Sequence, residues 1–131
     1  MTPIGKCPFC ELSERELISE NDTACAFLDC YPVSKGHSLI VPTRHVASIY
    51  ELASDQQKAI WKLVGQVREV LSVQFDPDGF NIGLNDGEAA GQTVGHAHVH
   101  VIPRYVGDLP DPRGGVRWVI PSKANYWGKD K

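Results

Sequence analysis

The run His96-Ala97-His98-Val99-His100-Val101-Ile102 is the stretch from which the fold of this chain is best approached. Side chains alternate between the two faces of a β-strand, so a strand here places three imidazoles in a row on one face and apolar residues on the other. Gly91-Gln92-Thr93-Val94-Gly95 precedes the run and Pro103 follows it. We therefore expect a flexible turn and then a short, half-buried strand that ends at the proline.

Three alternating histidines can share one metal ion or divide the steps of a reaction. Along a strand the first and third Cα atoms lie about 13 Å apart at ~3.3 Å per residue, which is awkward for one tetrahedral ion. Because histidine has an unperturbed pKa of about 6.5, a neutral imidazole can attack an electrophile while its neighbour carries a proton. A solvated histidine patch, or hydrogen-bonded core histidines, is the weaker alternative, since paired titratable groups behind a glycine-rich turn are typical of active sites.

The run resembles the signature of the histidine-triad (HIT) family of nucleotide hydrolases and transferases. Gly91-Gln92-Thr93-Val94 ahead of the run, and Asn85 eleven residues before His96, match that family as well. Upstream, Phe27-Leu28-Asp29 and residues 35–42 are similar to the family's nucleotide-binding strand and the segment with its fourth histidine. The resemblance extends over most of the chain, from about residue 7 to residue 104.

The family resemblance assigns catalytic roles to three histidines, His98, His100 and His37. The middle histidine of the triad is the family's nucleophile, so His98 is expected to attack the α-phosphorus of a nucleotide before water hydrolyses the nucleotidyl-histidine. His100 is placed to hydrogen-bond the phosphate or to protonate the leaving group. The resemblance implies that His37 supports the triad through a hydrogen bond. From its position alone, His37 is equally well interpreted as a satisfied core histidine.

Further residues are expected to bind the nucleotide. By resemblance, Asp29 lies near the ribose and Asn85 on the α-phosphate. Gly91-Gln92-Thr93 offers backbone N–H groups, an amide and a hydroxyl to phosphate oxygens, and its glycine lets the main chain approach closely. Such a turn is a weak signal alone, but beside the triad it predicts an oxyanion-binding turn. The predicted nucleotide-binding set is Asp29, Asn85, Gly91, Gln92, Thr93, His98 and His100.

Cys7-Pro8-Phe9-Cys10 forms a Cys-x-x-Cys pair at the start of the chain. In a reducing compartment such pairs bind metal or act in redox chemistry, and this one does not follow the strand-to-helix pattern of a thioredoxin-like site. Some zinc-bearing members of the family carry a histidine where His45 stands. The resemblance therefore implies a structural zinc held by Cys7, Cys10, His45 and His96, with no coordination position left for water. Free cysteines with a surface histidine are the alternative.

Length and composition indicate how many domains to expect and which kinds of partner to exclude. The 131 residues predict one domain with one core, which by the resemblance is a single HIT domain over 1–131. A net charge of −3 provides no broad basic field for nucleic acid or anionic lipid. No apolar stretch approaches the ~20 residues needed to cross a bilayer, and the N-terminus lacks a basic segment followed by an apolar one. We expect a cytoplasmic protein with no nucleic-acid or membrane partner, and the resemblance implies an adenine nucleotide as substrate.

Hydrophobic patterning predicts an α+β fold. Strands are expected at residues 24–28, 38–41, 80–84, 96–102 and 116–120, and helices at 13–18 and 54–74. Ser54 and Gln57 suggest a capping box for the long helix. Its apolar stripe is assigned to the core: Ile60, Leu63, Val64, Val67, Val70 and Leu71. We expect a HIT-like antiparallel sheet of about five strands with one long and one short helix, and the resemblance implies a homodimer.

The residues around the triad indicate which substrate branch of the family this chain resembles. Residues 85–93 and the Pro103-Arg104 exit are closer to the dinucleoside polyphosphate hydrolases, which predicts cleavage of diadenosine polyphosphates with release of AMP. An adenosine 5'-phosphoramidate hydrolase, which must protonate an amine, is the alternative enzyme. A non-catalytic nucleotide-binding or interaction module is the alternative of another class, disfavoured by the complete triad. Arg104, Arg113 and Arg117 either meet distal phosphates or are solvated surface arginines.

Overall fold

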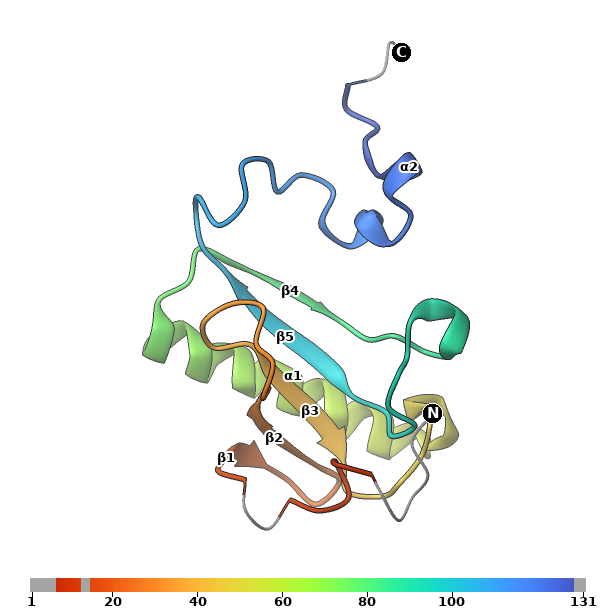
Figure 1. Cartoon of the computed structure of the whole chain (residues 1–131). Helices are drawn as coiled ribbons and strands as arrows, with labels where there is room; N and C mark the ends of the chain where they lie inside the picture. The colour runs from red at the N-terminus through yellow and green to blue at the C-terminus, as the bar shows by residue number, and fades with distance from the viewer. Residues whose placement is uncertain (1–6, 13–14, 129–131) are drawn as a thin grey trace.

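A five-stranded antiparallel sheet carries one long helix across one of its faces (Figure 1). The computed structural model describes residues 7–12 and 15–128. The sheet order is β1-β2-β3-β5-β4, and every neighbouring pair is antiparallel. The strands are β1 (Leu17–Glu20), β2 (Ala24–Leu28), β3 (Ser38–Pro42), β4 (Gly79–Gly83) and β5 (Val99–Arg104). The helices are α1 (Ser54–Phe75) and α2 (Pro121–Ala124), with short 3-10 segments η2 (Ile49–Glu51), η3 (Glu88–Ala90) and η4 (Gly115–Val119). The predicted fold class is confirmed.

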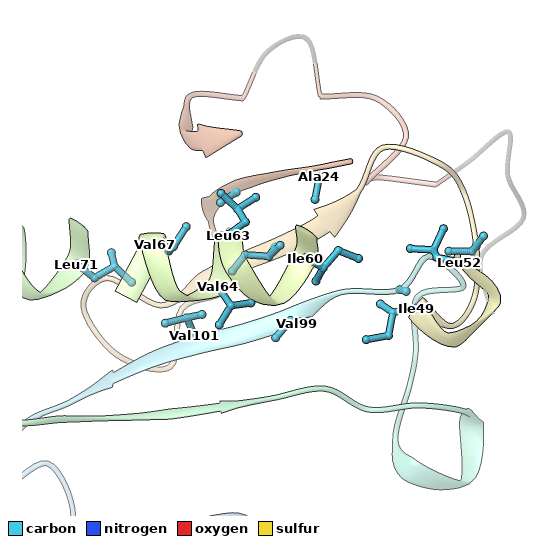
Figure 2. Close-up of a cluster of buried hydrophobic side chains, with 14 residues drawn as sticks. Ala24, Ile49, Leu52, Ile60, Leu63, Val64, Val67, Leu71, Val99 and Val101 are labelled. Carbon is cyan, nitrogen blue, oxygen red and sulfur yellow. The ribbon is translucent and has the colours of Figure 1, made fainter. Parts of the chain in front are cut away.

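The core lies between α1 and the sheet (Figure 2). The apolar stripe of α1 faces Val99 and Val101 of β5, and its buried members are Ile60, Leu63, Val64, Val67 and Leu71. Val70, which we assigned to the same stripe, is 40% exposed, so its assignment to the core is wrong. The turn of the helix carries Val70 away from the sheet, although it is adjacent to the fully buried Leu71.

The start of α1 differs slightly from the predicted capping box. Ser54 is the first helical residue, and Ala53 occupies the N-cap position. The Ala53 N–H donates to Gln56 Oε1 at 3.0 Å, while Gln57 Nε2 donates to the Leu52 carbonyl at 2.9 Å. Side-chain amides thus satisfy backbone groups that the helix itself leaves unpaired at its start. The capping pair is thus Ala53 and Gln56, one residue earlier than the predicted Ser54 and Gln57.

Two predicted elements are wrong. Residues 116–120 form no strand: they lie in η4 and at its C-cap, because Gly114 and Gly115 have positive φ angles of 94° and 45° and Pro121 opens α2. The helix expected at 13–18 is contradicted at its C-terminal end, where Leu17–Glu20 is β1 and pairs with β2. Residues 13–14 lie outside the described part of the chain. Cross-strand pairing outweighs a weak local helical pattern there.

The side chains of β5 alternate between the sheet face covered by α1 and the opposite face. Val99, Val101 and Pro103 are buried, whereas His100, Ile102 and Arg104 are partly exposed. The strand begins only at Val99, so His96 and His98 lie in the segment that leads into it. It also continues through Pro103, which is opposite Phe80 of β4. Among the described helices, none has the length and apolar character needed to span a membrane.

Candidate active site and metal cluster

A cavity of about 430 Å³ contains two of the three triad histidines. Residues from the N-terminal segment, the β2–β3 region, the turn before β5 and β5 itself meet there. Its lining comprises Pro8, Phe9, Arg15, Asp29, Cys30, Tyr31, Leu39, Asn85, Gly91, Thr93, Val94, His98 and His100. Six of the seven predicted nucleotide-binding residues therefore line one cavity, and the seventh, Gln92, does not.

The side chain of His98 is oriented by the main chain. Its Nδ1 lies 2.9 Å from the backbone carbonyl oxygen of His96. A carbonyl can only accept a hydrogen bond, so Nδ1 carries the proton and Nε2 keeps its lone pair. Phe9 packs against the imidazole with 5.0 Å between ring centroids. In the neutral imidazole, Nε2 therefore holds the lone pair and is the nucleophilic atom.

A second chain of hydrogen bonds fixes the tautomer of His100. The Val33 N–H donates to His37 Nδ1 at 3.1 Å, so the proton of neutral His37 must be on Nε2. That Nε2 lies 2.9 Å from His100 Nδ1 and therefore donates to it. His100 must then carry its own proton on Nε2, which is left to serve as a donor. Asp29 Oδ2 lies 3.4 Å from His37 Nε2 and favours positive charge on that ring.

Burial keeps His37 and His100 neutral. It lowers the pKa of His100 to about 4, with the neighbouring His98 and His37 lowering it further and Asp29 opposing the shift. Burial also lowers the pKa of His37, against an opposing effect of Asp29. Both directions agree with the hydrogen-bond pattern, in which each ring carries one proton. At neutral pH the site therefore offers a hydrogen-bond donor, rather than a cation, from His100.

Four potential metal ligands converge beside the triad. Cys7 Sγ, Cys10 Sγ and one ring nitrogen each of His45 and His96 all lie within 4.8 Å of one another. Cys10 Sγ is 3.0 Å from His45 Nδ1, and both sulfurs are 3.4 Å from His96 Nδ1. His96 Nε2 lies 2.8 Å from the Pro42 carbonyl and donates to it, which leaves Nδ1 unprotonated toward the sulfurs. Two thiols and two imidazoles, one oriented through a backbone carbonyl, are a donor set that fits tetrahedral zinc.

A second cluster, Asp29, His37 and His100, also brings its ligand atoms within 4.8 Å. The chemistry of its donors is different, because the Val33 N–H occupies His37 Nδ1 and places the ring proton on Nε2. A protonated Nε2 has no lone pair for a metal. This cluster is therefore organised for hydrogen bonding, whereas the cysteine cluster is organised for metal ligation.

Gln92 supports the turn before the triad from behind the cavity. Its side chain is buried; Oε1 accepts from the Gly87 N–H at 2.9 Å, and Nε2 donates to the carbonyls of Ala47 at 2.8 Å and Val94 at 3.0 Å. The amide is thus fully used within the protein. Gly91, at φ 97°, occupies a left-handed conformation in this turn. Gln92 shapes the loop that carries the cavity residues Gly91 and Thr93.

The cavity also includes residues that we did not single out from the sequence. Arg15 lies over the Phe27 ring, with its Cζ 4.4 Å from the centroid, and its Nη1 donates to Cys30 Sγ at 3.2 Å. Phe9 reaches the cavity from the Cys7-x-x-Cys10 segment, so the metal cluster and the cavity share a wall. Only the proximity of Phe9 to the cysteines in sequence could have indicated this; Arg15 gave no signal.

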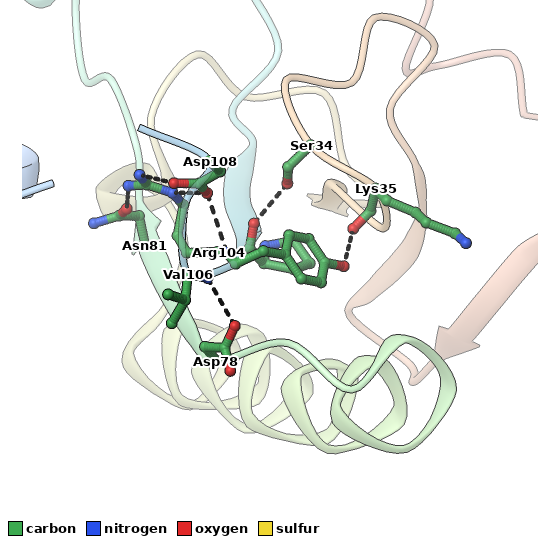
Figure 3. A network of polar contacts seen from close by, with 9 residues as sticks. Ser34, Lys35, Asp78, Asn81, Arg104, Val106 and Asp108 are labelled. Carbon is green, nitrogen blue, oxygen red and sulfur yellow. Dashed lines mark hydrogen bonds and ion pairs between the residues drawn. The ribbon is translucent and has the colours of Figure 1, made fainter. Parts of the chain in front are cut away.

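The three arginines considered for distal phosphates form bonds within the protein. Arg104 makes two hydrogen bonds to Asp108, at 2.7 and 2.8 Å, and one to Asn81 at 2.7 Å (Figure 3). Arg113 pairs with Asp111 at 2.9 Å. Arg117 donates to the backbone carbonyls of Lys123 and Ala124. None of these arginines lines the histidine cavity in the part of the chain that the structure describes.

Known proteins share this architecture. The chain is 37% identical over 103 residues to Protein hit of Bacillus subtilis, covering 76% of this chain and 71% of that protein. It is 34% identical to the adenosine 5'-monophosphoramidase hnt1 of Schizosaccharomyces pombe, covering 75% and 74%. An asymmetrical bis(5'-nucleosyl)-tetraphosphatase of the same yeast is 36% identical, covering 67% of this chain and 48% of that protein.

A solved structure and a family model complete the comparison. The zinc-bound histidine triad family protein from Mycobacterium smegmatis aligns with a TM-score of 0.72 at 30% identity, covering 82% of this chain and 85% of that protein. The HIT domain model matches residues 12–107. Sequence and fold thus agree, and the chain belongs to the HIT domain family.

Proposed function

We propose that this protein hydrolyses nucleotides at the α-phosphorus through a nucleotidyl-His98 intermediate, and that dinucleoside polyphosphates such as diadenosine polyphosphates are its substrates. The hydrogen bond from His98 Nδ1 to the His96 carbonyl carries the proposal, because it leaves the Nε2 lone pair available in the cavity. In the first step Nε2 forms a bond to the α-phosphorus, and the remaining nucleoside polyphosphate leaves with the electrons of the broken P–O bond. In the second step water attacks phosphorus, the P–N bond breaks, and AMP is released.

The other cavity residues have roles that follow from their polar groups. His100 Nε2–H donates to the phosphate, and neutral His37 holds it in that tautomer. Thr93, Asn85 and the backbone at Gly91 bind phosphate oxygens. Asp29 accepts hydrogen bonds from the ribose hydroxyls. These assignments agree with the shared lining of one cavity.

The leaving group distinguishes the two enzymatic branches. Expelling an amine requires a proton at the departing nitrogen, whereas a polyphosphate departs with little help. Because the pKa of His100 is lowered to about 4, this residue is neutral at pH 7 and is a poor source of that proton. The polyphosphate branch is therefore favoured. Phosphoramidate hydrolysis is the second candidate, favoured by the likeness to a monophosphoramidase.

The nucleophile is tested with His98→Asn. We expect kcat on diadenosine tetraphosphate to fall by at least ~1000-fold, as for removal of a covalent catalyst, while nucleotide affinity and the unfolding curve are retained. Rapid-quench mass spectrometry should detect AMP bound to the wild-type chain. Unchanged turnover by His98→Asn would contradict the mechanism. Nucleotide binding without turnover of either substrate class by the wild type would favour a non-catalytic binding module.

We also propose a structural zinc on Cys7, Cys10, His45 and His96. When bound, the metal would hold the N-terminal segment and orient His96; it leaves no coordination position for substrate. Metal analysis after dialysis should give one zinc per chain for the wild type and for the Cys30→Ser control, and less than half for Cys7→Ser. Equal zinc content in Cys7→Ser and wild type would exclude this ligand set.

A cytoplasmic homodimer completes the proposal. All four cysteines are free thiols, which is typical of proteins in a reducing compartment. Large apolar side chains such as Val106 and Val119 are 88% and 75% exposed, so a second copy has apolar surface to cover. Sedimentation equilibrium should give twice the mass of the chain, and a monomer at micromolar concentration would contradict the dimer. Cell fractionation tests the compartment.

A further inference from the structure

A second cavity, of about 450 Å³, lies between the sheet and the C-terminal segment of residues 108–128, which we call the arm. In Figure 1 the arm runs past β4 on the side away from α1. The match to the HIT domain ends at residue 107, so the arm extends beyond it. Most of the cavity lining is apolar: Val33, Ile102, Leu109, Pro112, Val116 and Trp118.

This cavity adjoins the histidine cavity. Strand β5 provides a shared floor, because Ile102 has the same orientation as His100 and is the next residue along that face. The β2–β3 loop provides a shared wall: Tyr31 lines the histidine cavity and Val33 lines the second one. The backbone of Val33 is also the group that binds His37. A ligand extending from His98 along β5 would enter the second cavity directly.

The cavity is held open by specific contacts of the arm. Asp108 at the start of the arm is bonded twice to Arg104, and Arg104 is bonded to Asn81 (Figure 3). Gly115 passes so close to β4 that a Cβ there would lie 3.0 Å from Asn81 Nδ2. The Trp118 indole N–H donates to the Arg113 carbonyl at 2.8 Å, which fixes the ring while leaving it 47% exposed. The site is therefore formed before any ligand binds.

The charge of the lining identifies the class of ligand. Arg104 and Asp108 are its charged residues among those the structure describes, and they neutralise each other at 2.7 Å. A phosphate group would find no free cation there. A flat, uncharged ring can instead stack on Trp118 and accept a hydrogen bond from Asn81 Nδ2, whose carbonyl oxygen is already used by Arg104. The volume lies within the range of small-molecule sites.

We propose that this cavity binds the distal nucleoside of a dinucleoside polyphosphate, with its base stacked on Trp118. The inference rests on the proposed function, since it assumes that the proximal α-phosphorus lies at His98. The polyphosphate then spans the β5 face from residue 98 to residue 102, about 13 Å at ~3.3 Å per residue. A substrate without a second nucleoside gains nothing from the arm, so this subsite provides the preference for dinucleotides.

The test compares two substrates on the same protein. For each variant, kcat/KM on diadenosine tetraphosphate is divided by kcat/KM on adenosine 5'-phosphoramidate. We expect Trp118→Ala to lower this ratio roughly tenfold through loss of one stacked base, and Trp118→Phe to restore most of it. Val116→Glu, which brings a charge to the same lining, should lower the ratio as well. Trp61→Ala, on the exposed surface of α1, is the matched control and should leave it unchanged.

Binding measurements separate failure of this subsite from failure of the proposed chemistry. In a His98→Asn background, calorimetry should show that diadenosine tetraphosphate binds more tightly than AMP, and that adding Trp118→Ala removes the difference. That result would support the subsite even if the wild type hydrolysed neither substrate. An unchanged ratio together with an unchanged affinity difference would overturn it. So would a Trp118→Ala effect confined to sedimentation, because a second copy of the chain would then be the occupant.

Discussion

The low pKa of His100 predicts how the stability of the protein changes in acid. In the folded protein burial, together with the neighbouring His98 and His37, lowers the pKa of His100 to about 4. In the unfolded chain the same imidazole titrates near 6.5. Between these values the unfolded chain binds a proton that the folded chain excludes. The contribution of His100 to the free energy of unfolding is therefore fully present above about pH 6.5 and decreases as the pH falls toward 4.

The magnitude follows from the two pKa values. One histidine contributes a slope of up to about 1.4 kcal/mol per pH unit, which over this interval amounts to about 3 kcal/mol. His100 is only partly buried, so solvent screening reduces the expected loss to about 2 kcal/mol. His37 and His96 also have lowered pKa values, caused chiefly by burial, and they add to the total slope of the wild type.

The contribution of His100 is isolated with His100→Gln, which cannot ionise. Urea unfolding at half-unit intervals from pH 4.5 to 7.5 gives the free energy of unfolding for both proteins. The curve of the variant should be shallower between pH 4.5 and 6.5 and parallel to that of the wild type above pH 7. The contributions of His37, His96 and any bound metal cancel to first order in the difference. Parallel curves across the whole range would refute the lowered pKa of His100 in the folded protein.

Four further substitutions test other parts of the structure. Gln92→Leu removes three buried hydrogen bonds and should lower the free energy of unfolding by about 2–3 kcal/mol in urea titrations; a loss below about 0.5 kcal/mol would contradict its role in the turn. Gly36→Ala forces a side chain into a left-handed position 2.8 Å from a ring carbon of Phe75, and should lower Tm by several degrees; an unchanged Tm would exclude strain there. Leu71→Ala should cost about 2–5 kcal/mol and its exposed neighbour Val70→Ala less than about 1 kcal/mol, so equal losses would place both residues in the core.

Most of the fold was predictable from residue patterns. Both failures occur where strand pairing, and not the local pattern of residues, decides the structure. The long helix and the central strands have periodic apolar residues, and the structure contains them nearly as predicted. The last segment misled because Val116, Val119 and Ile120 suggest a strand, yet glycines with positive φ precede it and no strand of the described chain pairs with it. At β1 the opposite happened: pairing with β2 made a strand of residues with little local preference for one.

The residues of the candidate site could be predicted from the sequence more fully than the contacts between them. Alternation of the histidines and the Cys-x-x-Cys pair are local patterns, and the structure brings both into contact. No local pattern could indicate that the Gln92 amide faces inward, since this depends on Ala47, 45 residues earlier in the chain. The arm cavity is formed by pieces from three distant stretches of sequence, and Trp118 in isolation resembles any partly exposed tryptophan.

The amide of Val33 has an unusual consequence for engineering. The protonation pattern of two histidines starts from a main-chain group, which survives replacement of residue 33 by any amino acid other than proline. The side chain at this position is accordingly free to vary for altered ligand preference, because only the path of the loop has to be preserved. Val33→Pro, conversely, removes this N–H. The ring protons of His37 and His100 are then no longer fixed on one nitrogen each, although neither histidine is substituted.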